Sequence, residues 1–213
     1  MHRNRERIIV MNLLSFLRRR PPIATPEALA EFIDGNAAFL VQKGLYEYSR
    51  ARAGHYAKVL FGEQRFKDAI EVSRWRAYPL GLAMVTELAD GLLRPAAADR
   101  QAQFDTLRAL ALSVFDRYPA PEPLGAEAWR ALRLDLENNL QRINMHAPKR
   151  AKDIPEPYVE KYFDLMPIHE KLRTAEFPTI GNYLRVTAIN IYVELEKRAD
   201  VPALAAMLSG RSA

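Results

Sequence analysis

The residues of this chain that could do acid–base chemistry are few, and the most suggestive are the neighbours His169 and Glu170. A histidine within reach of a carboxylate is a common arrangement in general acid–base catalysis. Adjacent residues on a helix point in different directions, however, so these two side chains do not form a catalytic pair by themselves. We therefore favour a histidine that packs at or near the surface, and we keep His169 as a candidate ligand-binding residue.

The segment SRWRAYP at 73–79 places arginines beside aromatic residues. Such a pattern can bind an anionic ligand or a nucleic acid through charge and stacking. The alternative is that Trp75 and Tyr78, three residues apart, pack inward while Arg74 and Arg76 reach outward to water. We favour the packing interpretation and retain Arg74, Trp75 and Arg76 as candidate ligand-binding residues.

Two further polar groups are candidates for binding an anion. Three basic side chains lie in a proline-containing connector at 147–157, namely Lys149, Arg150 and Lys152. We favour a solvated loop for them, and an anion site gains support if they meet the arginines near Trp75 in the folded chain.

Arg185 stands in an otherwise apolar helix with Asn182, Tyr183 and Asn190. This polar set could line a pocket, but we favour hydrogen bonds between helices.

Sequence motifs that fix other chemistries are missing. No serine stands in a G-x-S-x-G pattern, and there is no glycine-rich loop of the kinds that hold phosphates. None of the four histidines follows a glutamate by three residues or another histidine by four, which excludes the usual helical metal sites. The chain has no cysteine, so disulfides and thiolate ligands are excluded. We expect no metal and no cofactor, and we lean towards a protein that is not an enzyme.

The first 20 residues form a leader that carries the whole formal charge of +5, because six arginines meet one glutamate there and the rest of the chain is neutral. Its apolar run at 8–17 is about half of the ~20 residues that span a membrane. Three arginines close this run, where a signal peptide would have a cleavage site of small residues. A basic and apolar leader predicts docking to an anionic membrane surface or to a partner groove. The residues expected to make this contact are Leu13, Leu14, Phe16, Leu17, Arg18, Arg19 and Arg20.

Two other interpretations of the leader stay open. The leader helix could fold back and cover the core of the body, or it could be an extension that is removed. Met11 also offers a second possible start, which would leave the sequence MNLLSFLRRR before Pro21.

Helices must position all of these side chains, because no stretch alternates apolar and polar residues as a strand does. Apolar residues instead recur at helical spacing over 26–53, 74–93, 104–118, 129–143, 158–166 and 179–198. One or two short helices are expected over 55–73, with a break near Gly62. The run at 74–93 is apolar on nearly every side, which indicates a central, buried helix.

Local signals predict where these helices begin and end. Helix starts are expected at Thr25–Pro26, at Pro95, at Asp153 with Glu156 as a capping box, and at Asp200. A helix end is expected at Gly54. Pro79 should kink the central helix or mark its first turn, and Pro167 and Pro178 should interrupt the chain.

The fold expected from these patterns is all-α, a single compact bundle of about seven to ten helices. A chain of 213 residues with 49% apolar and 27% charged residues is ordinary for one soluble domain. We divide it into leader and linker at 1–24 and a helical domain at 25–213, with a possible internal boundary near 147–157. The predicted core includes Phe104, Leu107, Ala111, Val114, Phe115, Leu132, Leu136 and Leu140.

The function expected from the sequence is that of a non-enzymatic interaction or accessory protein. We expect it in the cytoplasm, at the periphery of a membrane or bound to a protein partner. Nucleic-acid binding is not expected, since a long helix stands where a helix-turn-helix protein has three short ones. The alternative is a helical enzyme or a protein that binds a small anion near Arg74, Arg76, His169 and Arg185.

Overall fold

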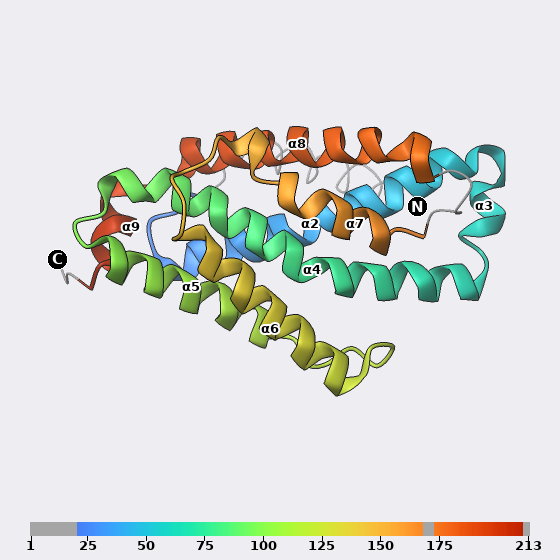
Figure 1. Cartoon of the computed structure of the whole chain (residues 1–213), viewed down its shortest axis with the longest axis horizontal. Helices are drawn as coiled ribbons and strands as arrows, with labels where there is room; N and C mark the ends of the chain where they lie inside the picture. Colours follow the sequence, from blue (N-terminus) through green and yellow to red (C-terminus); the bar gives the residue numbers. More distant parts are fainter. Residues whose placement is uncertain (1–20, 168–172, 211–213) are drawn as a thin grey trace, which may run out of the picture.

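The structure is a computed structural model that describes residues 21–167 and 173–210, with the backbone alone for 173–175. These residues are 81% helical and contain no strand. The α-helices, shown in Figure 1, are α2 (Pro26–Ala53), α3 (Ala57–Leu60), α4 (Gln64–Leu93), α5 (Arg100–Asp116), α6 (Gly125–Ile143), α7 (Val159–Leu165), α8 (Arg173–Arg198) and α9 (Val201–Leu208). The all-α class is confirmed, whereas the expected count of seven to ten helices is confirmed only in part. The described residues hold seven helices of at least seven residues, and the four-residue α3.

Helix α4 is the centre of the bundle. Every residue from 77 to 90 is buried, because α2, α5, α6 and α8 all pack against this half of the helix. In Figure 1, α4 crosses the middle of the molecule between α8 on one side and α5 and α6 on the other. Gly81 lets α2 approach closely, since a Cβ atom there would lie 2.7 Å from the carbonyl oxygen of Ala37. The apolar run at 74–93 thus predicted a buried helix correctly.

Three helix boundaries lie where the sequence predicts them. The Thr25 hydroxyl accepts a hydrogen bond from the backbone N–H of Ala28 and caps α2. This helix ends at Ala53, and Gly54 follows with φ of 51°, a conformation that favours glycine. Asp200 caps α9 by accepting from the N–H of Ala203.

Pro178 does not interrupt the chain as predicted, and Pro79 does not mark the first turn of its helix. Helix α4 begins at Gln64, ten residues before the predicted start, and runs through Pro79. Helix α8 likewise begins at Arg173 and contains Pro178. A proline inside a helix removes one backbone hydrogen bond. Helix α4 continues past Pro79 because buried residues on both sides of the proline pack against neighbouring helices.

Two predicted helix starts are wrong for a different reason. Pro95 lies in the 3₁₀ turn Arg94–Ala96, and α5 begins at Arg100 with Asp99 as its cap. Asp153 caps no helix, because its carboxylate is taken by Arg150 and Lys152, at 2.8 Å and 2.9 Å. At Asp153 these basic partners take the carboxylate that was expected to cap a helix.

The predicted core is buried, with one exception. Leu136 and Leu140 are fully buried, as are the predicted residues of α5, Phe104, Leu107, Ala111, Val114 and Phe115. Leu132 is only half-buried. The largest aromatic group packs between α4, α5 and α6 and consists of Trp75, Tyr78, Phe115, Tyr118 and Trp129.

The segment ahead of α2 is fastened to the junction between α8 and α9. Ile23 forms a parallel bridge with Ala199, through a 2.8 Å bond to the carbonyl of Arg198 and a 2.9 Å bond from Asp200. The leader at 1–20 lies outside the described residues. Residues 147–157 contain the 3₁₀ turn Ala151–Asp153, which packs on α8, and the division of the chain into domains stays a prediction.

Candidate functional site

A polar cavity of about 140 Å³ opens between α4, the end of α6 and the connector that follows α6. The side chains that can do chemistry in it are Glu87, Asn139, Arg142, His146, Lys149 and Tyr158. Asn139, Arg142 and His146 share one side of α6 and its continuation, at spacings of three and four residues. Glu87 reaches the cavity from the buried half of α4.

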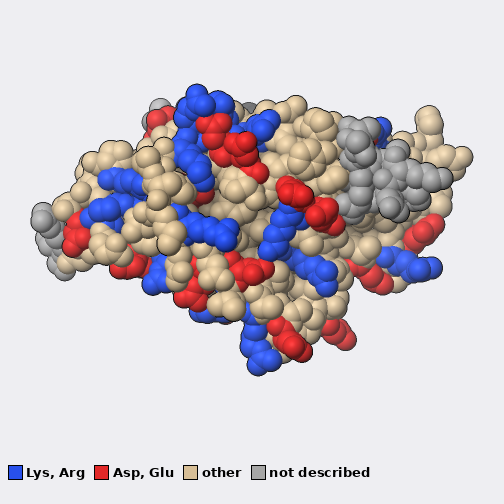
Figure 2. Space-filling model, in the orientation of Figure 1, with Lys and Arg blue, Asp and Glu red and all other residues tan. Residues whose placement is uncertain are grey.

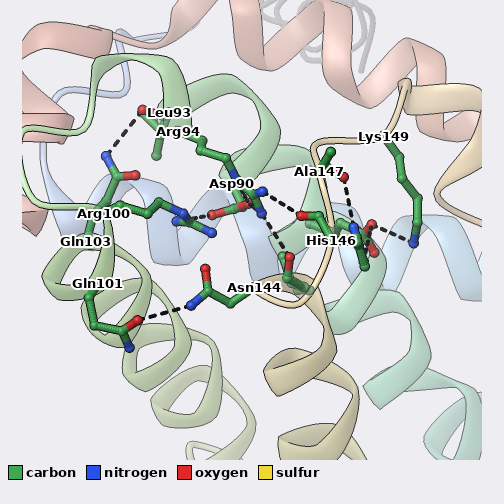
Figure 3. Close-up of polar contacts among 12 residues, drawn as sticks. Asp90, Leu93, Arg94, Arg100, Gln101, Gln103, Asn144, His146, Ala147 and Lys149 are labelled. Carbon is green, nitrogen blue, oxygen red and sulfur yellow. Dashed lines mark hydrogen bonds and ion pairs between the residues drawn. The ribbon is translucent and has the colours of Figure 1, made fainter.

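Glu87 is the electrostatic centre of this cavity. Its side chain is 4% exposed, and its Oε1 lies 2.9 Å from Lys149 Nζ and 3.6 Å from His146 Nε2. Figure 3 shows how the side chains of His146 and Lys149 lie at the connector. The other ring nitrogen of His146 lies 2.9 Å from the carbonyl oxygen of Ala147. A buried carboxylate is costly unless it is paired, so Glu87 holds the connector against α4 through these two partners.

Tyr158 contributes a buried hydroxyl on the opposite side of the cavity. Burial raises its pKa, the charge of Glu87 raises the pKa further, and Arg142 lowers it. The hydroxyl therefore keeps its proton at neutral pH and can donate a hydrogen bond. It forms no hydrogen bond with any other described residue.

A second buried carboxylate, Asp90, supports the cavity from one turn further along α4. It forms ion pairs with Arg94 at 2.6 Å and with Arg100 at 2.7 Å. Arg94 also donates to the carbonyl oxygens of Ile143 and His146, at 2.8 Å and 2.7 Å (Figure 3). Arg94 thus satisfies carbonyls that the end of α6 leaves unpaired, and it fixes the backbone of His146.

The arrangement can bind an anion and can move a proton. Lys149 balances the charge of Glu87, which leaves Arg142 as a surplus positive charge. His146 is half-buried beside a carboxylate, which is the geometry of a general acid or base. In the described part of the chain, no three acidic or histidine side chains gather as metal ligands do.

The two basic patches predicted from the sequence do not meet. Lys149 lies in the cavity and pairs with Glu87. Glu87 is 13 residues from Arg74, which corresponds to roughly 20 Å along the axis of α4. Arg150 and Lys152 are exposed and pair with Asp153.

Arg74 and Trp75 occupy a separate place between α2, α4 and α5. Arg74 pairs with Glu71 and lies over the ring of Trp75, with its guanidinium carbon 4.6 Å from the ring centre. The Trp75 indole donates to the same carboxylate at 2.7 Å. Both residues line a small cavity of about 100 Å³ beside Tyr118, whereas Arg76 is exposed and is not part of its lining.

The remaining candidates are separated from these sites or are not described. Arg185 is exposed and donates to Asn182 at 3.4 Å, and Tyr183 donates to the carbonyl of Leu40 in α2 at 3.0 Å. His169 and the leader residues Leu13, Leu14, Phe16, Leu17, Arg18, Arg19 and Arg20 lie outside the described residues.

The sequence contains a signal for this cavity besides the predicted site residues. Glu87 and Asp90 are carboxylates within a helix that is otherwise apolar on all sides. Such carboxylates need cationic partners from elsewhere in the chain. The segment from Arg142 to Lys149 supplies one such partner, Lys149, and a histidine, but no local spacing links it to α4.

A second surface stands apart from the core at the turn between α2 and α4. We call residues 50–69 the tip; none of them is buried. Tyr56 is 77% exposed and Val59 is 63% exposed. The tip has five basic and two acidic side chains, an excess of three positive charges. Figure 2 shows mostly uncharged surface at this α3 end of the molecule, with both basic and acidic side chains beside it.

Comparison with known proteins provides no relative. No protein-family model, no curated protein and no solved structure matches this chain. Among the described helices, none is long and apolar enough to cross a membrane.

Proposed function

We propose that this chain is a non-enzymatic accessory protein that docks on an anionic membrane surface. The observation that carries the proposal is the tip, in which exposed apolar side chains stand among basic ones at one end of the bundle. Apolar groups that enter the lipid interface, with basic groups around them at the headgroups, are the usual composition of a peripheral membrane contact.

The shape of the tip supports this contact. A hollow of about 730 Å³ lies between the end of α2 and α3. Its charged lining residues are Arg50, Lys58 and one carboxylate, Glu47, and its aromatic ones include Tyr46 and Phe61. Arg50 and Lys58 form no ion pair with any described residue. Both charges are therefore available to phosphate groups of lipids.

The leader supplies a second contact of the same chemistry. Stable membrane anchoring usually takes two signals, because one short apolar or basic element binds only weakly. Each basic residue near an anionic surface contributes about 1 kcal/mol. In this proposal Leu13, Leu14, Phe16 and Leu17 enter the interface, while Arg18, Arg19 and Arg20 remain at the headgroups.

The test is co-sedimentation of the full-length protein with vesicles. We expect binding to vesicles that contain phosphatidylserine, and little binding to pure phosphatidylcholine. Binding should weaken with salt, because the Debye length falls from ~10 Å at 0.1 M to ~3 Å at 1 M. Equal sedimentation with and without anionic vesicles would overturn the proposal, and a protein groove would then be the partner to seek.

Variants separate the two contacts. Replacing Tyr56 and Val59 by serine should reduce binding, whereas Met145→Ser, at a site 80% exposed and outside the tip, should not. The triple variant Lys58→Gln, Arg65→Gln, Lys67→Gln should also bind less than its control, Arg76→Gln, Arg130→Gln, Lys197→Gln. Replacing the three leader arginines by glutamine should weaken binding without changing the far-UV circular dichroism spectrum.

A further inference from the structure

We propose that the cavity between α4, α6 and the connector binds a small oxyanion, a single phosphate group, through Arg142, Asn139 and Tyr158. This site is independent of membrane docking, because it lies about the buried half of α4 and away from the tip.

Hydrogen-bond donors without partners indicate that the cavity receives a ligand. Arg142, Asn139 and Tyr158 all line it, and none of their side chains forms a hydrogen bond or ion pair with a described residue. Tyr158 is only 7% exposed, so water reaches its hydroxyl only through the cavity. Tyr158 is the buried member of this set, whereas Asn139 is half-buried and Arg142 is exposed. A buried donor is normally satisfied, so the unpaired Tyr158 hydroxyl, together with two further unpaired donors at the same cavity, points to one acceptor with several oxygen atoms.

The charges in the cavity favour an anion over a cation. Glu87 is the one carboxylate of the lining, and the Nζ of Lys149 neutralises it at 2.9 Å. Arg142 is then a positive charge in excess. Glu87 thereby acts as a positioning residue that fixes Lys149 and His146, and it does not contact the ligand.

The size of the cavity limits the ligand. Its volume of about 140 Å³ corresponds to about five water molecules at ~30 Å³ each. A phosphate or carboxylate group fits this space, whereas a nucleotide does not. Arginine binds both groups through paired N–H donors, so the two probes must be compared directly.

The experiment is a calorimetric titration of the full-length protein with inorganic phosphate, and separately with acetate, in a chloride buffer. We expect saturable binding of phosphate that exceeds binding of acetate. Arg142→Gln should weaken it at least tenfold, and Tyr158→Phe should weaken it several-fold while removing one oxygen atom. The control is Arg130→Gln, an exposed arginine on the same helix that is outside the cavity lining, and it should bind as the wild type does.

Thermal unfolding provides a second readout for variants that fold less well. Phosphate should raise the Tm of the wild type and of Arg130→Gln more than that of Arg142→Gln, since a ligand stabilises only the form that binds it. The proposal is overturned if neither probe gives saturable binding, or if Arg142→Gln and Tyr158→Phe bind phosphate as the wild type does. Preference for acetate would replace phosphate by a carboxylate as the ligand.

Discussion

At the scale of single residues, the main feature is an asymmetry within the buried ion pair of α4. Glu87 is 4% exposed, whereas the side chain of its partner Lys149 is 30% exposed. If the pair is broken, the lysine can turn to water but the carboxylate cannot. The two partners should therefore differ in what their removal costs.

This asymmetry predicts the order of two substitutions. Lys149→Met leaves a buried carboxylate without its closest cation and should lower the free energy of unfolding by about 1–3 kcal/mol. Glu87→Gln should cost about 1 kcal/mol or less, because Lys149 regains water and no buried charge remains. Urea unfolding followed by circular dichroism measures both values. A larger loss for Glu87→Gln would show that the lysine, and not the carboxylate, is the group that cannot be solvated.

The residues of the cavity show how far sequence could predict a site. Lys149 was a candidate because it stands in a basic run, and it does line the cavity. His146 was set aside because no partner lies at helical spacing from it. Its partner, Glu87, belongs to another helix, and only packing brings them together. A site that is assembled from several helices leaves no local sequence pattern. The charged residues can then be identified as candidates, but which of them pair with each other cannot be predicted.

At the scale of helices, the two glycines of α2 face different surroundings. Gly35 is exposed, and a Cβ atom there would meet nothing within 4 Å. At Gly44 a Cβ atom would overlap the hydroxyl of Tyr162, which donates to the carbonyl of Val41 at 2.9 Å. Alanine should therefore have opposite effects at the two positions.

We predict that Gly35→Ala stabilises the protein by about 0.5–1 kcal/mol, because alanine loses less entropy in a helix than glycine does. Gly44→Ala should destabilise it by about 1–3 kcal/mol, since Tyr162 must move and its hydrogen bond is lost. The shift in Tm of each variant tests this. If both variants are stabilised, α2 and α7 are less closely packed than the structure has them.

Helix α6 offers a matched pair of leucines. Leu136 is fully buried, and Leu134 on the same helix is 59% exposed. Leu136→Ala should cost about 2–5 kcal/mol through lost burial and an unfilled cavity. Leu134→Ala should change stability by less than about 0.5 kcal/mol. Denaturant titration of both variants decides whether the buried face of α6 is assigned correctly.

The helices also separate what local sequence predicts from what it does not. The caps at Thr25 and Asp200 were predictable, because a cap is made by residues three positions apart. Pro79 was expected to kink the helix or mark its first turn, yet α4 extends through it. Helix α4 stays continuous because it packs against helices that are distant in the sequence. These contacts cannot be predicted from the residues around Pro79.

At the scale of the whole molecule, tyrosines packed in the core make the stability of the protein depend on pH in the alkaline range. Burial raises the pKa of Tyr183 to about 12 and raises the pKa of Tyr162 well above its ordinary value. In the unfolded chain these hydroxyls ionise near pH 10. Above that pH the unfolded state loses protons that the folded state keeps, so stability must fall as pH rises.

We therefore predict that the free energy of unfolding falls above about pH 10, by about 1.4 kcal/mol per pH unit for each such tyrosine. Below pH 10 these tyrosines should leave stability unchanged. Tyr162→Phe should flatten the alkaline slope, whereas Tyr56→Phe, at a site 77% exposed, should not. Urea unfolding at several pH values measures the slopes, and identical slopes for both variants would contradict the prediction.

The fastening of residues 21–23 to the end of α8 has a consequence for synthesis on the ribosome. The hydrogen bond from Arg198 to the carbonyl of Pro21 joins residues 177 positions apart. At 5–20 residues per second, the ribosome needs roughly 10–35 s to make the chain between them. The apolar middle of α4, residues 77–90, is made about 108 residues before Arg198, so it waits roughly 5–22 s of that time without a complete α8 to cover it. We expect the nascent chain to bind chaperones that hold exposed apolar helices until translation ends.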